Sequence, residues 1–198
     1  MKFAFDTDEV LRDTLSKMKA TYEKFFIEDY VSEEGEEEFE YKIIEPVNSH
    51  KFSEHFLFPS DNDFINFMYL DFPMNIFGHS PSISANTFNT FSEIQKNVLS
   101  KRDKLSVIGM GVAKIKPASL FFYSKYGMEV DNIQFYNKKT INKIWSKFDV
   151  IVTANPDILE IKPKNKISIK VNSEYNQNCD ADFSIDSIEG FTSVYNQL

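Results

Sequence analysis

The sequence predicts an α/β protein in which helices cover both faces of a parallel sheet. An apolar strand opens the chain, and from Lys104 onward short apolar segments alternate with segments of helical spacing. Strands that alternate with helices are typical of a parallel, three-layer core. The chain has 198 residues, 42% of them hydrophobic, which is enough for one domain with a sizeable core.

The first strand is expected at Lys2–Phe5, followed by an amphipathic helix over about 13–28. The apolar residues at helical spacing in that helix are Leu15, Met18, Tyr22 and Phe25. Later strands are predicted at 105–109, 132–136, 149–153, 166–171 and 182–185, with helices at 118–126 and 140–147.

The stretch from about 29 to 103 lacks this rhythm. It holds a run of glutamates between 33 and 40, many phenylalanines and four prolines, with helices expected at 63–69 and 85–99. The glutamate run predicts a solvated loop, or alternatively a surface that binds cations or docks a partner. We therefore divide the chain into a core, 1–28 and 104–198, and an inserted cap or docking segment, 29–103, that offers a surface to a protein partner.

Composition narrows the partners and the compartment. The net charge of −8 argues against general binding to nucleic acid. The single cysteine, Cys179, excludes an intrachain disulfide and a cysteine-based metal site. We expect neither a signal peptide nor a membrane span. The residue usage resembles that of AT-rich bacterial or phage genomes, so we expect the chain in the cytoplasm, of a host cell if it comes from a phage, or in a virus particle.

The most informative feature is the pair of carboxylates, Asp6 and Asp8, at the end of the first strand. Residues spaced i, i+2 leave a strand on the same side, and the carboxyl edge of an open α/β sheet is where ligands bind. No basic residue adjoins the pair in the sequence, so the two repel each other unless a cation or a shared proton relieves them. Mg²⁺ suits such oxygen ligands, whereas a solvated Asp-Thr-Asp turn is the alternative.

The opening of the chain resembles motif one of the haloacid-dehalogenase-like (HAD) superfamily, a strand followed by DxDx(T/V)L, at residues 5–11. The helical insertion soon after it resembles the 5'-nucleotidase branch. A lysine, Lys138 or Lys139, before a short helix and the strand 149–153, and the closing segment 180–188, resemble the rest of that core. The resemblance covers about 1–28 and 104–191, and it implies a three-layer, Rossmann-like sheet with a cap.

The resemblance also implies a chemistry. In the family the first aspartate attacks phosphorus and the second acts as general acid and base, which assigns these roles to Asp6 and Asp8. Lys138 or Lys139 is implied to neutralise the phosphate and the attacking carboxylate. The implied cofactor is Mg²⁺, with Asp6, Asp8 and Asp157 as its candidate ligands.

Three positions depart from the family pattern. The residue after the second aspartate is Glu9, where the family usually has a glycine that permits an unusual backbone turn. The second core strand ends in Gly109-Met110-Gly111 rather than in a serine or threonine. The strand 149–153 ends in Thr153, and the nearest acid after it is Asp157, which weakens a Mg²⁺ site.

Three function classes follow. The first is a HAD-fold protein with lost or weak catalysis, a pseudoenzyme used for binding or assembly, for example as a structural component of a phage particle (virion). The second is a Mg²⁺-dependent phosphomonoesterase that acts on a nucleotide or another small phosphate through an aspartyl-phosphate. The third is an unrelated metal-binding module. An acid beside Asp6 and Asp8 at the end of the strand 149–153 favours the enzyme, whereas Thr153 there favours lost activity. His50, His55 and His79 are too scattered to predict a ligand set.

Overall fold

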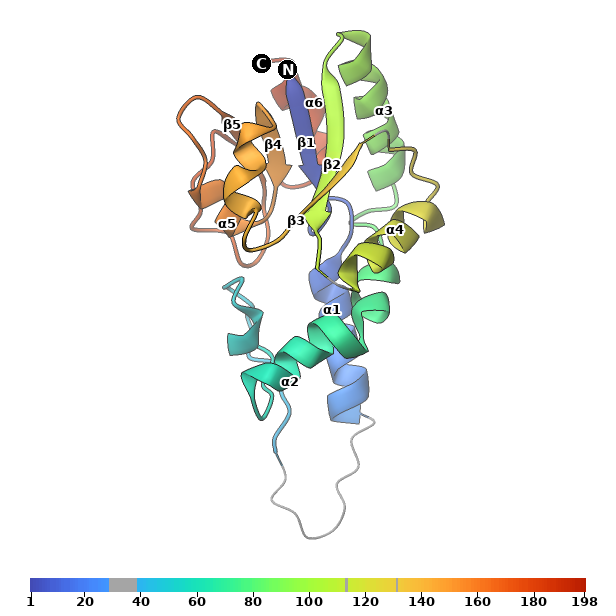
Figure 1. Ribbon diagram of the computed structural model, residues 1–198, viewed down its shortest axis with the longest axis vertical. Coiled ribbons are helices and arrows are strands. Elements are labelled where there is room, and N and C mark those ends of the chain that lie inside the picture. Colours follow the sequence, from blue (N-terminus) through green and yellow to red (C-terminus); the bar gives the residue numbers. More distant parts are fainter. Residues whose placement is uncertain (29–38, 113, 131) are drawn as a thin grey trace.

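The computed structural model describes residues 1–28, 39–112, 114–130 and 132–198 (Figure 1). Within them, six parallel strands form one sheet in the order β3-β2-β1-β4-β5-β6. The strands are β1 (Lys2–Asp6), β2 (Lys104–Met110), β3 (Ile133–Tyr136), β4 (Val150–Thr153), β5 (Ile167–Val171) and β6 (Phe183–Ile185). The predicted α/β class with a parallel sheet is confirmed.

Strand β1 lies at the centre of the sheet between β2 and β4. Phe3 is opposite Leu105 on one side and opposite Val150 on the other, and both pairings are parallel. The prediction that the 149–153 strand lies beside the opening strand is therefore confirmed. Because all strands are parallel, their carboxyl ends meet at one edge of the sheet.

Helices and shorter turns connect the strands. The α-helices are α1 (Thr14–Tyr22), α2 (Asp61–Asn66), α3 (Thr87–Ser100), α4 (Ile115–Lys125), α5 (Pro156–Glu160) and α6 (Phe191–Tyr195). The 3₁₀ turns are η2 (Phe52–Glu54), η5 (Ile141–Ser146) and η6 (Ile188–Gly190), and the wider π-helical turns are η1 (Glu23–Glu28), η3 (Phe67–Asp71) and η4 (Met74–Gly78).

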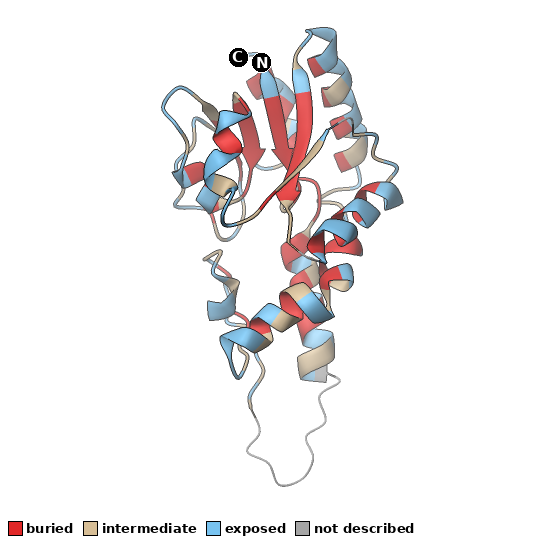
Figure 2. Cartoon of the chain, viewed as in Figure 1, coloured by how far each residue is buried: buried red, intermediate tan, exposed pale blue. Residues whose placement is uncertain are grey.

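The two faces of the sheet are covered by different helices. Phe3 and Phe5 of β1 pack with residues of α3, α4 and α6, whereas Ala4 packs with residues of η5 and α5. This alternation is what the period of two in a strand requires of a sheet buried on both faces. Figure 2 shows the central strands buried along most of their length, between helices that each expose one side.

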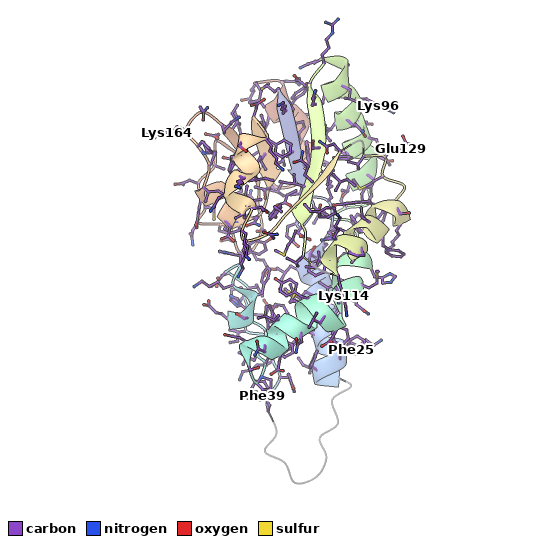
Figure 3. All side chains as sticks on the ribbon, in the orientation of Figure 1. Phe25, Phe39, Lys96, Lys114, Glu129 and Lys164 are labelled. Atoms are coloured by element: carbon purple, nitrogen blue, oxygen red, sulfur yellow. The ribbon has the colours of Figure 1, made fainter. Side chains whose placement is uncertain are left out.

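A separate helical unit, formed by α1, η1 and residues 39–78, lies beyond the carboxyl edge of the sheet (Figure 1). Its own apolar cluster includes Met18, Tyr22 and Phe67, and it extends to the start of α4. Phe25 and Phe39 lie at the end of the unit farthest from the sheet, where Phe25 packs on Phe72 at 4.5 Å between ring centroids (Figure 3).

The packing does not follow the predicted division at 28 and 103. The strands of the described sheet all lie outside 29–103, but α3 from that range packs on the sheet through Phe91, and α1 packs within the helical unit. The expectation of an inserted unit stays a prediction. Most of the predicted glutamate loop, at 29–38, lies outside the described residues. Among the described helices, none is both long and apolar enough to cross a bilayer.

Substitution of Phe91 tests whether α3 is a layer of the core. Phe91 is 2% exposed, and its ring meets Phe5 edge-on at 5.7 Å. We expect Phe91→Ala to lower the free energy of unfolding by about 3–5 kcal/mol in urea titrations, because it removes a buried ring from the sheet. Phe25→Ala, in the partly exposed far end of the helical unit, is the control and should cost clearly less. Equal losses would contradict the assignment of α3 to the core.

Candidate active site

Four strand ends converge at the carboxyl edge of the sheet. They carry Asp6 on β1, Met110 on β2, Tyr136 on β3 and Thr153 on β4. Met110 and Tyr136 are paired in register, and Thr153 follows directly on the segment of β4 that is paired with β1. The side chains that surround the predicted nucleophile are therefore a thioether and two hydroxyls.

Asp6 is 1% exposed and accepts hydrogen bonds on both carboxylate oxygens. The backbone N–H of Thr7 donates to Oδ1 at 2.9 Å, and the Thr153 hydroxyl donates to Oδ2 at 2.6 Å. The Tyr136 hydroxyl lies 3.3 Å from Oδ2. Asp6 and Thr153 therefore meet at this edge, and the group that Asp6 meets at the end of β4 is a hydroxyl rather than an acid.

The hydroxyls around Asp6 are themselves held in place. Thr153 Oγ1 accepts from the backbone N–H of Asn155 at 3.0 Å, and the Asn155 side chain donates to the Tyr136 hydroxyl at 3.2 Å. Burial, and next the negative charge of Asp8, raise the pKa of Asp6 to about 7, although the hydrogen bonds to Asp6 oppose the rise. The Asp6 carboxyl group therefore changes between its protonated and ionised forms near neutral pH.

Asp8 is paired with Arg12, which corrects the expectation that no basic group relieves the two aspartates. Arg12 Nε donates to Asp8 Oδ1 at 2.6 Å, and the Thr14 hydroxyl donates to the same oxygen at 2.5 Å. Arg12 is four residues beyond Asp8 in the sequence, and it reaches Asp8 because the chain turns back. The backbone N–H groups of Leu11 and Arg12 both donate to Thr7 O in this turn.

Glu9 makes that turn in the left-handed region, with φ of 58°. Only glycine adopts this region without cost, and another residue costs about 1–2 kcal/mol there. The Glu9 carboxylate accepts from the backbone N–H of Leu15 at 2.8 Å, and so satisfies a free donor in the first turn of α1. Burial raises the pKa of Glu9 to about 8. The hydrogen bond of the Glu9 side chain thus offsets part of the free energy that its backbone conformation costs.

A cavity of about 340 Å³ lies between the sheet edge and the helical unit. Its polar lining includes Asp6, Asp8, Glu9, Lys138 and Asp157, and its apolar lining includes Leu15, Met18, Phe52, Phe64, Met68, Phe77 and Met110. Lys138 lines the cavity and Lys139 does not, so geometry favours Lys138 as the motif lysine.

His50 is a lining residue that the sequence pattern does not predict. Its Nε2 lies 2.9 Å from Asp157 Oδ1, across 107 residues of sequence. Both side chains are partly exposed, at 35% and 52%. An isolated histidine in an irregular segment does not indicate this contact in the sequence. The contact forms because the helical unit packs close to α5 in the folded chain.

The predicted Mg²⁺ ligands Asp6, Asp8 and Asp157 all line the cavity, but they do not form a set that fits the ion. No group of three His, Cys, Asp or Glu side chains in the described ranges could hold a metal. Thr153 occupies the strand end where an acid is needed, Asp8 is bound to Arg12, and Asp157 is bound to His50. The residues present therefore do not match the cofactor that the family resemblance implies.

Two substitutions at Glu9 separate its backbone strain from its side-chain bond. Glu9→Ala keeps the strained φ and loses the bond to Leu15 N, whereas Glu9→Gly loses the bond and relieves the strain. We expect the alanine variant to be less stable than the glycine variant by about 1 kcal/mol in chemical denaturation. Variants of equal stability would show that this turn carries no conformational cost.

The raised pKa of Asp6 predicts a pH-dependent effect of Asp6→Asn. Between about pH 4 and pH 7 the folded chain holds a proton that the unfolded chain has lost, so stability falls as pH rises through this window. We expect Asp6→Asn to be stabilising by on the order of 3 kcal/mol near pH 8 and close to neutral near pH 4. Asp157→Asn controls for net charge. A stability difference independent of pH would argue against a protonated Asp6.

The comparisons with known proteins concern structure alone. No protein-family model and no curated protein matches the chain. A haloacid dehalogenase-like hydrolase of Burkholderia xenovorans superposes with a TM-score of 0.56 at 11% identity. The match covers 99% of this chain and 96% of the hydrolase. The HAD hydrolase YfnB of Bacillus subtilis, bound to magnesium, gives a TM-score of 0.56 at 13% identity, with 98% of each chain covered.

A third match is the L-2-haloacid dehalogenase of Xanthobacter autotrophicus, whose structure carries covalently bound chloropropionic acid. It has a TM-score of 0.56 and 10% identity, and the match covers 100% of this chain and 98% of the dehalogenase. At such identities the likeness concerns the fold, and it extends over the helical unit as well as the sheet. The chain thus has the HAD-like fold, with six parallel strands in the sheet of its described residues.

Proposed function

We propose that this chain is a HAD-fold protein with lost or weak catalysis, which uses its cavity for binding. The observation that carries the proposal is Thr153 at the end of β4, where its hydroxyl is bonded to Asp6 Oδ2 at 2.6 Å. A threonine hydroxyl supplies no negative charge at the place where the metal of a HAD phosphatase would need it.

The state of Asp6 supports the same conclusion. A carboxylate attacks phosphorus with a free, ionised oxygen. Here both oxygens accept hydrogen bonds, and near neutral pH a large fraction of Asp6 is protonated. The hydrogen bonds make the ionised carboxylate less nucleophilic, and protonation lowers the fraction that is ionised.

The cavity supports a binding role. Its volume of about 340 Å³ falls in the range of small-molecule sites, and its lining combines apolar and aromatic side chains with a similar number of polar ones. Assembly with a partner through the helical unit is a second proposed role, because this unit exposes the apolar side chains of Ile65, Leu70 and Met74. A role in a phage particle remains a prediction from residue usage.

The alternative is a Mg²⁺-dependent phosphomonoesterase, of the 5'-nucleotidase type, acting on a nucleotide or another small phosphate. Two observations favour it: Asp6 and Asp8 line the cavity, and so does Lys138. The magnesium in the Bacillus subtilis hydrolase belongs to that protein, at 13% identity to this one.

A phosphatase assay distinguishes the two functions. We expect the unmodified chain to hydrolyse p-nitrophenyl phosphate and a nucleoside monophosphate panel weakly or not at all in MgCl₂, and Asp6→Asn to remove any hydrolysis that exists, because the amide is not nucleophilic. A brisk Mg²⁺-dependent rate that Asp6→Asn abolishes would establish the alternative. In that case Lys138→Ala should lower the rate, and Lys139→Ala, outside the cavity, is its matched control.

A further inference from the structure

Arg12 is completely buried, at 0% exposed, and is among the largest side chains buried to this extent in the described residues. It follows the motif-one loop, residues 7–11, whose closure onto Thr7 O turns Arg12 back toward Asp8. A guanidinium is always charged, and burying it requires a compensating charge and hydrogen-bond acceptors. A buried arginine beside the predicted metal ligands thus needs an explanation.

The contacts of Arg12 reach three separate parts of the fold. Nε donates to Asp8 Oδ1 at 2.6 Å. Nη1 donates to the backbone oxygen of Phe77 in η4 at 2.9 Å and to Ser119 Oγ in α4 at 3.0 Å. The guanidinium also lies over the Phe77 ring, 5.0 Å from its centroid. These contacts leave the guanidinium no freedom to move away from Asp8.

The pair also engages one oxygen of Asp8, because Oδ1 accepts from both Arg12 and Thr14. A divalent ion at Asp8 would have to lie close to a fixed positive charge, and the two cations would repel each other in a poorly solvated site. On the neighbouring Asp6, the Thr153 and Tyr136 hydroxyls both lie against Oδ2, at 2.6 and 3.3 Å.

We infer that Arg12 is a built-in counter-ion for Asp8, which neutralises the motif from within the chain and makes the cavity independent of divalent metal. Arg12 is a positioning residue: it fixes Asp8 and joins the motif-one loop to η4 and α4. The inference concerns the cavity of the proposed function and deepens it, since a ligand would then bind there without a bridging metal ion.

The unmodified chain gives the first test. Its melting temperature is measured in EDTA and in about 10 mM MgCl₂, with ionic strength matched by NaCl to remove general screening. We expect no Mg²⁺-specific shift. Titration with Mn²⁺, followed by the loss of the free-ion signal in electron paramagnetic resonance, should show no saturable uptake of one equivalent. Uptake of one equivalent that Mg²⁺ displaces would overturn the inference, and this test needs no variant to fold.

Arg12→Gln and Arg12→Lys give the second test. The glutamine removes the charge and leaves Asp8 unpaired, so we expect the melting temperature in EDTA to fall by roughly 10 °C and to recover partly in MgCl₂. The lysine keeps a charge that can reach Asp8, so we expect a fall without recovery in MgCl₂. A glutamine variant indifferent to MgCl₂, or a lysine variant that responds equally, would show that the charge of Arg12 does not stand in for a cation.

These outcomes are separate from those of the phosphatase assay. A metal-dependent stability of the unmodified chain without turnover would overturn the counter-ion and leave the binding function standing. Turnover that depends on Asp6 and persists in EDTA would overturn the proposed function and leave the counter-ion standing.

Discussion

The burial of the Arg12 guanidinium constrains the arrangement of the whole molecule. The cost of removing this charge from water is several kcal/mol, and it is recovered only when partners are placed accurately around the side chain. Those partners come from the motif-one loop, from η4 and from α4. The position of the helical unit over the sheet is thereby coupled to the ion pair. Of the three Arg12 side-chain nitrogens, Nη2 has no hydrogen-bond partner in the described part of the chain, which is a residual cost.

The strand order then decides which residues can take part in chemistry. Because β1 lies between β2 and β4, the neighbours of Asp6 are fixed by where those strands end. A change of one residue at a strand end replaces one group of the site without disturbing the sheet. Thr153 is such a position: it is completely buried and bonded, and it satisfies Asp6 with a neutral donor in place of a charged ligand.

Much of the fold could be predicted from the sequence, because buried parallel strands are short apolar runs between helices. The strands 149–153 and 166–171 are of this kind, and their boundaries agree closely with β4 and β5. The location of α3 could not be predicted. Its amphipathic pattern shows that one face of the helix is buried, but it does not show which part of the protein covers that face. Phe91 is part of that face.

At the site, the sequence likewise indicates individual residues but not the residues that they contact in the folded chain. Asp6, Asp8 and Lys138 follow from local patterns, and all three line the cavity. The partnership of Arg12 with Asp8 depends on the backbone turn at Glu9, which brings together two residues that are not adjacent in the sequence. The His50–Asp157 contact depends on tertiary packing across the cavity.

Glu9 and Arg12 hold the motif-one loop against the helical unit. Its backbone conformation is costly, and its side chain offsets part of that cost by binding the first turn of α1. Arg12, three residues later, binds η4. Two consecutive ties therefore connect the end of β1 to the helical unit that covers the cavity. Any opening of the unit would break the bond of the half-buried Glu9 side chain or the bond of the buried Arg12 guanidinium, and a buried charge is more costly to leave unpaired than a neutral group. A ligand that fits the closed cavity gains from this rigidity, because the protein has already met the entropic cost of ordering the site in the course of folding.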